Sequence, residues 1–156
     1  AGWAKPGKKN TFPIASDSLH NDQIGTVMDL YSTILETAGA KNPSGHVVDG
    51  VSLLKQLSGG GNPGRPDHFM CHFPHSHRSS NFTAFRKGDW KLIYRYKGQT
   101  KYELYDLQKD PFETNNLAKS EPKKLKEMTK AMIARLEKEG ALYPSEGDKE
   151  LKPLLP

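Results

Sequence analysis

Four short apolar segments between residues 68 and 107, separated by turn residues, constrain the fold of this chain most strongly. Turn-forming residues, glycine among them, stand at 87–89 and at 98–100. Within 90–96 every second residue is large and apolar, so one face of a strand would carry Trp90, Leu92, Tyr94 and Tyr96. Because strands joined by short turns pair antiparallel, we predict a four-stranded antiparallel meander with strands at 68–73, 81–86, 90–96 and 102–107.

A helical pattern follows the predicted sheet. We expect this helix to begin after Ser120 as N-cap, with Pro122 in its first turn, and to end at Gly140. Its apolar stripe consists of Leu125, Met128, Met132, Ile133 and Leu136. Neither the stripe nor the sheet can bury its apolar face alone, so the helix is expected to pack on one face of the sheet.

Another helical pattern precedes the sheet, over residues 22–38. Asn21 or Asp22 is the expected N-cap, and Gly39 the expected stop. The apolar positions that recur at helical spacing are Ile24, Val27, Met28, Tyr31, Ile34, Leu35 and Ala38. A second, shorter helix is expected at 52–57.

These elements predict an α+β fold, in which a four-stranded antiparallel sheet is packed by a C-terminal helix and preceded by one or two helices. We divide the chain into a connector, a helical segment, a sheet-and-helix subdomain and a loose tail. Their ranges are 1–20, 21–64, 65–143 and 144–156.

Composition excludes several classes of function. The 156 residues carry 23 Lys and Arg against 18 Asp and Glu, a net charge of +5, but the lysines are scattered and no basic stripe with stacking aromatic residues is present. Nucleic acid is therefore not an expected partner. No run of 18 apolar residues is present, which argues against a membrane partner. The only cysteine, Cys71, excludes a disulfide within the chain, and we read it as a small apolar strand residue.

The chain shows no specific catalytic motif, and we predict no catalytic residue and no metal ligand in it. The one dense polar cluster lies at the end of the first predicted strand and comprises His72, His75, His77 and Arg78. Imidazole and guanidinium groups donate hydrogen bonds to anions, so these four residues are predicted to bind substrate. A polar surface loop and a metal site are the alternatives; no helical His-x-x-x-His pair or neighbouring carboxylate supports the metal.

A glycosylation sequon, Asn81-Phe82-Thr83, follows this cluster. It has meaning only in a eukaryotic secretory pathway.

Five segments in order over residues 3–118 resemble the sulfatase family of the alkaline-phosphatase superfamily. Ser32 stands where the family often has Pro. The segments are Trp3-Ala4-Lys5-Pro6-Gly7, Met28-Asp29-Leu30-Tyr31-Ser32-Thr33-Ile34-Leu35 with Ala38-Gly39-Ala40, Asp49-Gly50-Val51-Ser52-Leu53-Leu54, Arg86-Lys87-Gly88-Asp89-Trp90-Lys91-Leu92-Ile93, and Glu103-Leu104-Tyr105-Asp106-Leu107 with 110–118 after it.

The resemblance implies a hydrolase of sulfate esters that uses formylglycine and Ca²⁺. Family members make formylglycine from Cys or Ser in a Cys/Ser-x-Pro-Ser-x-Arg-like run, which Cys71-His72-Phe73-Pro74-His75 does not match. The resemblance therefore places the catalytic machinery and both cofactors in an N-terminal domain upstream of Ala1. That domain and a sulfated small molecule or glycan are the implied partners, and the chain alone is expected to be inactive. A periplasmic, extracellular or lysosomal location is the family's habit.

The same resemblance places the cluster from His72 to Arg78 at the rim of the substrate pocket. Three alternatives stay open: a related phosphatase or phosphonate hydrolase, a free-standing anion- or glycan-binding module, and a structural fragment without function. A part that normally docks on a larger domain predicts an exposed apolar patch.

Overall fold

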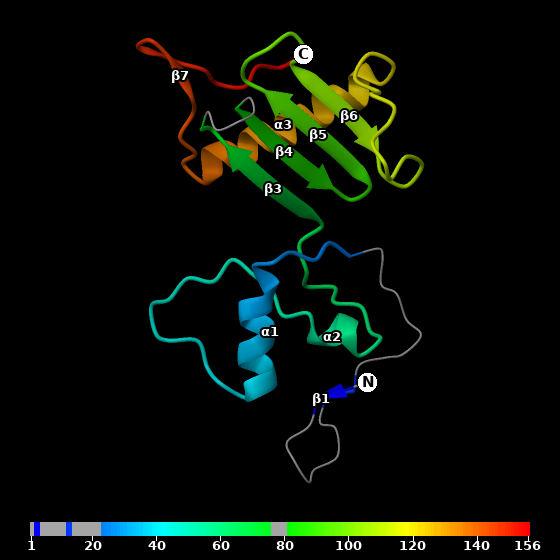
Figure 1. Cartoon of the computed structure of the whole chain (residues 1–156), viewed down its shortest axis with the longest axis vertical. Coiled ribbons are helices and arrows are strands. Elements are labelled where there is room, and N and C mark those ends of the chain that lie inside the picture. Colours follow the sequence, from blue (N-terminus) through cyan, green and yellow to red (C-terminus); the bar gives the residue numbers. More distant parts are fainter. Residues whose placement is uncertain (1, 4–11, 14–22, 76–80) are drawn as a thin grey trace. The chain divides into compact units, whose positions relative to one another are not determined.

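The computed structural model describes residues 2–3, 12–13, 23–75 and 81–156, and the chain divides into two compact units, Ala1–Asp67 and His68–Pro156 (Figure 1). Within these ranges no helix is long and apolar enough to cross a membrane.

The first unit contains two short helices and a two-stranded ladder. Strands β1 (Gly2–Trp3) and β2 (Phe12–Pro13) pair antiparallel. Helix α1 spans Asp29–Ala38, and α2 spans Leu54–Leu57. Gly39 ends α1 with a φ of 66°, in the left-handed region that glycine adopts without a steric cost, as the sequence predicts.

Helix α1 begins at Asp29, so the predicted start at residue 22 is wrong. The residues before Asp29 form hydrogen bonds with the 62–65 segment instead of continuing the helix. The Gln23 amide group donates to the carbonyl of Asn62 and accepts from its N–H, both at 3.0 Å, and Arg65 Nε donates to Ile24 O at 2.6 Å. The predicted caps, Asn21 and Asp22, lie outside the described residues.

The second unit contains the predicted antiparallel meander. Its strands follow one another in the order β3-β4-β5-β6, and every neighbouring pair is antiparallel. They span His68–Phe73, Phe82–Lys87, Trp90–Arg95 and Tyr102–Asp106. The fold class predicted from the sequence is thus confirmed.

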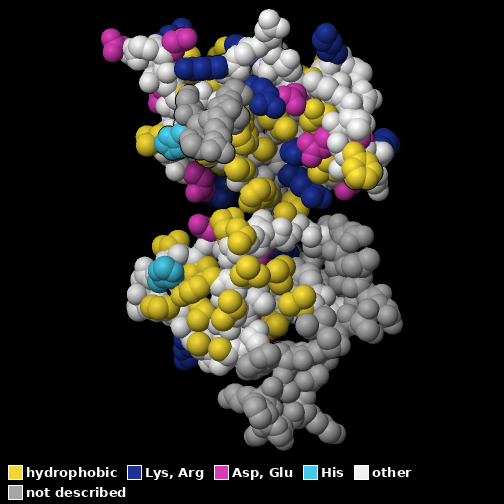
Figure 2. Space-filling view, in the orientation of Figure 1, with side chains coloured by type: hydrophobic (Ala, Val, Ile, Leu, Met, Phe, Trp, Pro, Cys, Tyr) yellow, Lys and Arg dark blue, Asp and Glu magenta, His cyan; other side chains and the backbone are white. Residues whose placement is uncertain are grey.

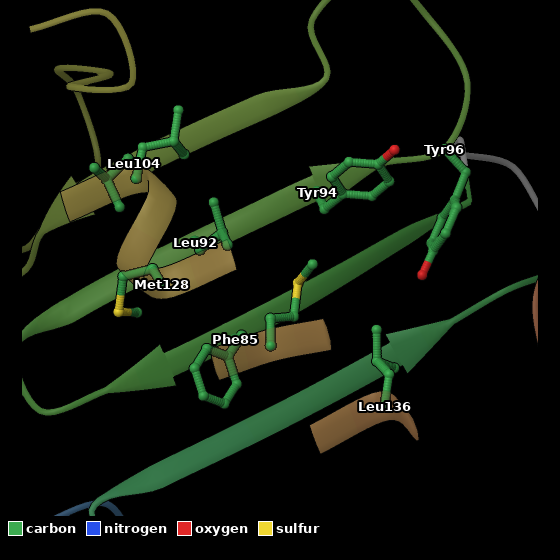
Figure 3. Packing of buried hydrophobic residues seen from close by; sticks show 9 residues of the cluster. Phe85, Leu92, Tyr94, Tyr96, Leu104, Met128 and Leu136 are labelled. Atoms are coloured by element: carbon green, nitrogen blue, oxygen red, sulfur yellow. The ribbon is translucent and has the colours of Figure 1, made fainter. Parts of the chain in front are cut away.

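Helix α3 (Pro122–Lys138) packs on one face of this sheet (Figure 1). One cross-strand row, in register over β3 to β6, supplies the centre of that face. Leu92 and Leu104 of this row are fully buried, together with Met132 and Leu136 of the helix (Figure 3). The buried cluster is Phe85, Leu92, Tyr94, Tyr96, Leu104, Leu125, Met128, Met132 and Leu136. Four of these nine residues belong to the predicted helix stripe, whose fifth member, Ile133, is partly buried.

The N-terminus of α3 differs from the prediction in one residue. Glu121, not Ser120, is the N-cap, and no side chain caps the first turn. The Ser120 hydroxyl instead donates to Leu117 O at 3.2 Å. Pro122 occupies the first turn as predicted, because its missing N–H leaves no donor without a partner there.

The segment after α3 is ordered, in contrast to the expected loose tail. Strands β7 (Ser145–Glu146) and β8 (Lys149–Glu150) form a hairpin. Beyond it Pro153 is buried, and the Tyr102 hydroxyl donates to Leu154 O at 2.9 Å. The sheet face that carries Tyr102 therefore binds the chain's last residues.

Candidate functional site

The predicted histidine cluster lies at one end of β3. His72 is the penultimate residue of this strand, and His75 follows its end by two residues. His77 and Arg78 lie outside the described residues. The structure therefore brings His72 and His75 to the same strand end and leaves the placement of the other two undescribed.

Both ring nitrogens of His72 have partners within the protein. Nε2 lies 2.7 Å from the carbonyl of Leu142, which only accepts, so Nε2 carries a proton. Nδ1 lies 2.8 Å from the hydroxyl oxygen of Thr83, which itself lies 2.8 Å from the Tyr96 hydroxyl. His72 is therefore a positioning group in this structure, and its ring offers no open nitrogen to a ligand.

In the network from His72 to Tyr96, the Tyr96 hydroxyl is uncharged at physiological pH. Burial raises the pKa of Tyr96 to about 12, although its hydrogen bond with Thr83 acts in the opposite direction. Thr83 is fully buried, and the rings of Tyr96 and Tyr143 both stand edge-on to the His72 ring. These contacts therefore hold the end of β3 against β4 and against residues 142–143.

The two ends of the segment that follows β3 are tied together at its base. Asn81 Nδ2 donates to the carbonyl of Pro74, and Tyr96 N–H donates to Asn81 O at 3.0 Å. The rings of Phe73 and Phe82 stack beside them with centroids 5.8 Å apart. These contacts fix both the entry and the exit of the segment that carries His75.

The same contacts give Asn81 of the sequon a structural role. Asn81 is 3% exposed and its amide nitrogen is already hydrogen-bonded, so a glycan cannot be attached there in the folded protein. The Asn81 side chain holds the start of the segment that follows β3 next to the end of that segment.

His75 presents its ring to solvent. The residue is exposed, and its ring lies edge-on to Phe73 with centroids 5.9 Å apart. An imidazole held on one side by an aromatic ring and open on the other can donate a hydrogen bond to an anion. Of the predicted binding residues in the described part of the chain, His75 has this open geometry.

Cys71 lies on β3 and is exposed. Its register partner is Ala84, next to Thr83 of the His72 network. Side chains alternate between the two sheet faces, so Cys71 points away from the face that carries His72. A nucleophilic role together with His72 is therefore not supported by the geometry.

The residues present do not fit a calcium or formylglycine site. Over 23–75 and 81–156, no three or more His, Cys, Asp or Glu side chains are grouped so that they could hold a metal ion. Calcium needs six to eight oxygen ligands, and the chain also lacks the Cys/Ser-x-Pro-Ser-x-Arg run.

A hollow of about 610 Å³ lies on the β5–β6 hairpin. Its charged centre is the ion pair of Arg95 and Glu103, and the Tyr105 hydroxyl donates to the same carboxylate at 2.9 Å. Asn116 uses both ends of its amide on backbone groups of the hairpin and its own loop. The side chains of Arg95 and Tyr105 are thus both bonded to the Glu103 carboxylate, an arrangement typical of a structural surface.

Sequence reasoning missed the residues that hold the cluster in place, namely Asn81, Thr83 and Tyr96. No local signal identifies them. Seven residues join the predicted strands 68–73 and 81–86, and a connection of that length does not fix which residue lies opposite His72, which the structure pairs with Thr83.

The comparisons with known proteins agree on one family. Residues 11–141 match the family model described as "N-sulphoglucosamine sulphohydrolase, C-terminal". An uncharacterized sulfatase of Schizosaccharomyces pombe is 36% identical over 128 residues, which cover 74% of this chain and 22% of that protein. Arylsulfatase K of Xenopus laevis is 32% identical over 121 residues, with 70% of this chain and 22% of that protein covered.

Solved structures extend this result to the fold. A protein in complex with its substrate D-glucosamine-2-N,6-O-disulfate matches with a TM-score of 0.56 and 28% identity, over 70% of this chain and 23% of that one. Phosphonate monoester hydrolase of Agrobacterium radiobacter, at 22% identity and a TM-score of 0.51, shares the fold alone.

The extent of these matches is as informative as their identity. The chain spans about a fifth of the length of the curated relatives it matches. The family model covers most of the chain and is that of a C-terminal region. The chain therefore belongs to the sulfatase family, and the part of the family that it matches is the C-terminal domain.

Proposed function

We propose that this chain is the C-terminal part of a hydrolase of sulfuric esters and that it completes the fold and the rim of the substrate pocket. The observation that carries the proposal is the match of residues 11–141 to a sulfatase C-terminal region, in a chain that spans about a fifth of the length of its relatives. The nucleophile, formylglycine, and the Ca²⁺ ion belong to the other part of the protein. Without that part the chain hydrolyses no sulfate ester.

The rim is formed by the segment that follows β3. His75, His77 and Arg78 contact the anionic or hydroxyl groups of the substrate, and His72 fixes the base from which they extend. The exposed imidazole of His75 and the tied ends of the segment support this assignment. A guanidinium group binds two anion oxygens at once, so Arg78 is expected to supply the strongest contact.

The substrate class is a sulfated small molecule or glycan. One structural neighbour holds an amino sugar with two sulfate groups, which makes a sulfated glucosamine the first substrate to test. A second anionic group beside the reacting ester would explain why a cationic segment is useful at the rim.

The test uses the full-length protein with Arg78→Ala or His75→Ala. Hydrogen bonds to charged groups contribute about 1.5–3 kcal/mol, so kcat/KM for the best sulfated substrate should fall about tenfold or more. Lys130→Ala is the matched control, because it removes a cation from the exposed face of α3. Unchanged kcat/KM for every accepted substrate would refute the rim assignment.

A further inference from the structure

Helix α3 carries a row of lysines on the side turned away from the sheet. Lys123, Lys126 and Lys130 are all exposed, and their spacing of three and four residues places them on one helix face. The opposite side of the helix buries Met128 and Met132 in the core. From Lys123 to Lys130 the helix axis rises by roughly 10 Å, so the three cations are spread along the helix. We call these three residues the α3 lysine row.

The charges of the row are not balanced within the described part of the chain. No carboxylate there lies within ion-pair distance of any of the three Nζ atoms. Two other cations of the same helix are paired, because Lys124 binds Glu127 at 2.7 Å and Arg135 binds Glu139 at 3.0 Å. The row therefore presents three uncompensated positive charges to solvent.

The opposite face of the sheet has a different charge pattern. Figure 2 shows this face of the second unit, where Lys and Arg side chains lie beside Asp and Glu side chains. Lys91 binds the Glu113 carboxylate at 2.6 Å, and Arg95 binds the Glu103 carboxylate. These two cations are neutralised, whereas those of the α3 lysine row are not.

The row works against the stability of its own helix. Lysines three and four residues apart repel one another. The first turn, where the helix dipole favours a negative charge, contains Lys123 and no acidic residue. Glutamine has nearly the same helix propensity as lysine, so helix formation does not require three cations here. An anion bound along the row would remove the repulsion.

We propose that the α3 lysine row binds the sulfate groups along the chain of a sulfated polysaccharide. The proposal rests on the function proposed above and deepens it, because it makes the substrate a polymer rather than a small sulfate ester. A row of separated cations matches a polyanion that repeats its charges along its length.

The chemistry of the row favours this ligand over nucleic acid. Lysine supplies a compact charge on a flexible stem, which suits anionic groups whose positions vary along a flexible polymer. Single-stranded nucleic acid is usually bound with aromatic side chains on which its bases stack. Residues 119–140 contain no aromatic side chain, so the row offers charge without stacking.

Binding of fluorescently labelled long-chain heparin to the full-length protein, measured by anisotropy, tests the row. The triple variant Lys123→Gln/Lys126→Gln/Lys130→Gln should raise the Kd about tenfold, since each exposed charge pair contributes modestly and three act together. The difference from the unsubstituted protein should shrink as salt is added, because salt screens exposed charges. Circular dichroism should show unchanged helix content, as expected from the similar helix propensities.

Turnover of a sulfated monosaccharide should stay the same in this variant. The proposal assigns the row to the further sulfate groups of a long chain, which a single sugar lacks. Lys130→Ala, the control for the rim, should for the same reason leave the kcat/KM of a small substrate unchanged.

A charge-matched variant is the control for heparin binding. Lys41→Gln/Lys138→Gln/Lys149→Gln removes the same net charge from exposed positions outside the row and should change the Kd little. An equal increase in Kd in both triple variants would overturn the proposal, because net charge alone would then attract heparin. An unchanged Kd in the row variant, or equally tight binding of single-stranded DNA through the row, would overturn it as well.

The row and the proposed function can fail separately, because binding of heparin needs no catalysis. A full-length protein that binds heparin through the row and releases no sulfate would refute the proposed function and leave the row as a binding surface. A protein that releases sulfate, and whose Kd for heparin is the same in the row variant, would refute the row and leave the function intact.

Discussion

The carboxylate of Asp29 and the guanidinium of Arg65 form an ion pair in which each side chain is only 4% exposed. Arg65 also donates to Ile24 O and Val51 O, while Asp29 accepts from the N–H groups of Thr26 and Val51. The pair joins residues 36 positions apart and closes the first unit.

Arg65→Met should therefore destabilise the first unit strongly. Removing one partner of a buried ion pair leaves the other charge uncompensated, at a cost of about 3–5 kcal/mol. The free energy of unfolding of this unit can be measured from hydrogen exchange of the α1 amides. Lys41→Met removes an exposed cation next to the same helix and should cost little, so equal effects of the two variants would contradict this account.

The pair also predicts a dependence of stability on pH. Burial alone raises the pKa of Asp29, but hydrogen bonds from the Val51 and Thr26 amides and from Arg65 outweigh burial and hold the pKa below its ordinary value. The unfolded chain then takes up the proton first as the pH falls. The stabilisation is full above the unfolded pKa of about 3.9 and is lost as the pH falls through the lower pKa of the folded state.

Exchange of the α1 amides, corrected for intrinsic rates, should show this loss below about pH 4. Asp29→Asn should flatten the dependence, whereas Asp49→Asn, at an exposed position, should leave it as it is. The same slope in all three proteins would exclude Asp29 as the source.

Gly50→Ala should disrupt the packing of α1. The added Cβ atom meets Met28 O at 2.1 Å and Asp29 N at 2.8 Å, both backbone atoms that a side-chain rotation cannot move. Overpacking of this kind costs about 1–3 kcal/mol or more. At Gly61 a Cβ atom meets nothing within 4 Å, so Gly61→Ala is a control that should be neutral or slightly stabilising in the same exchange measurement.

The tyrosines of the second unit predict alkaline unfolding in a defined range. Burial raises the pKa of Tyr96 and Tyr105 to about 12, and for Tyr105 the neighbouring Glu103 carboxylate adds to this increase. Their stabilisation is complete below the unfolded pKa of about 10 and is lost as the pH rises towards 12. Absorbance at 295 nm and far-ultraviolet circular dichroism should change together over this range; full ionisation near pH 10 in a folded protein would contradict the packing.

The second unit was predictable because its signals are local. Alternation in residues 90–96 and glycine turns on either side define the meander, and the stripe from Leu125 to Leu136 packs on the apolar face of that sheet. The start of α1 was not predictable in this way. Gln23 and Arg65 take the segment before Asp29 out of the helix through contacts some 40 residues apart, and helix propensity carries no record of such contacts.

The candidate site was only partly visible in the sequence. Clustering of His72 and His75 at a strand end was visible, whereas the saturation of the His72 ring by Thr83 and Leu142 depends on residues 11 and 70 positions away. The exposed face of α1 was also hidden. The apolar pattern of this face predicts burial. The segment on which α1 packs contacts the polar side of the helix and leaves the apolar face exposed.

One measurement tests the central claim most directly, namely sulfate release by the purified full-length protein from a panel of sulfated sugars and aryl sulfates. Matching phosphate and phosphonate esters serve as comparison substrates. If the chain is part of a sulfatase, the full-length protein releases sulfate with a kcat/KM well above that for the comparison esters, and the 156-residue chain releases none. A folded full-length protein that turns over only the phosphate or phosphonate esters, or a 156-residue chain that releases sulfate alone, would contradict it.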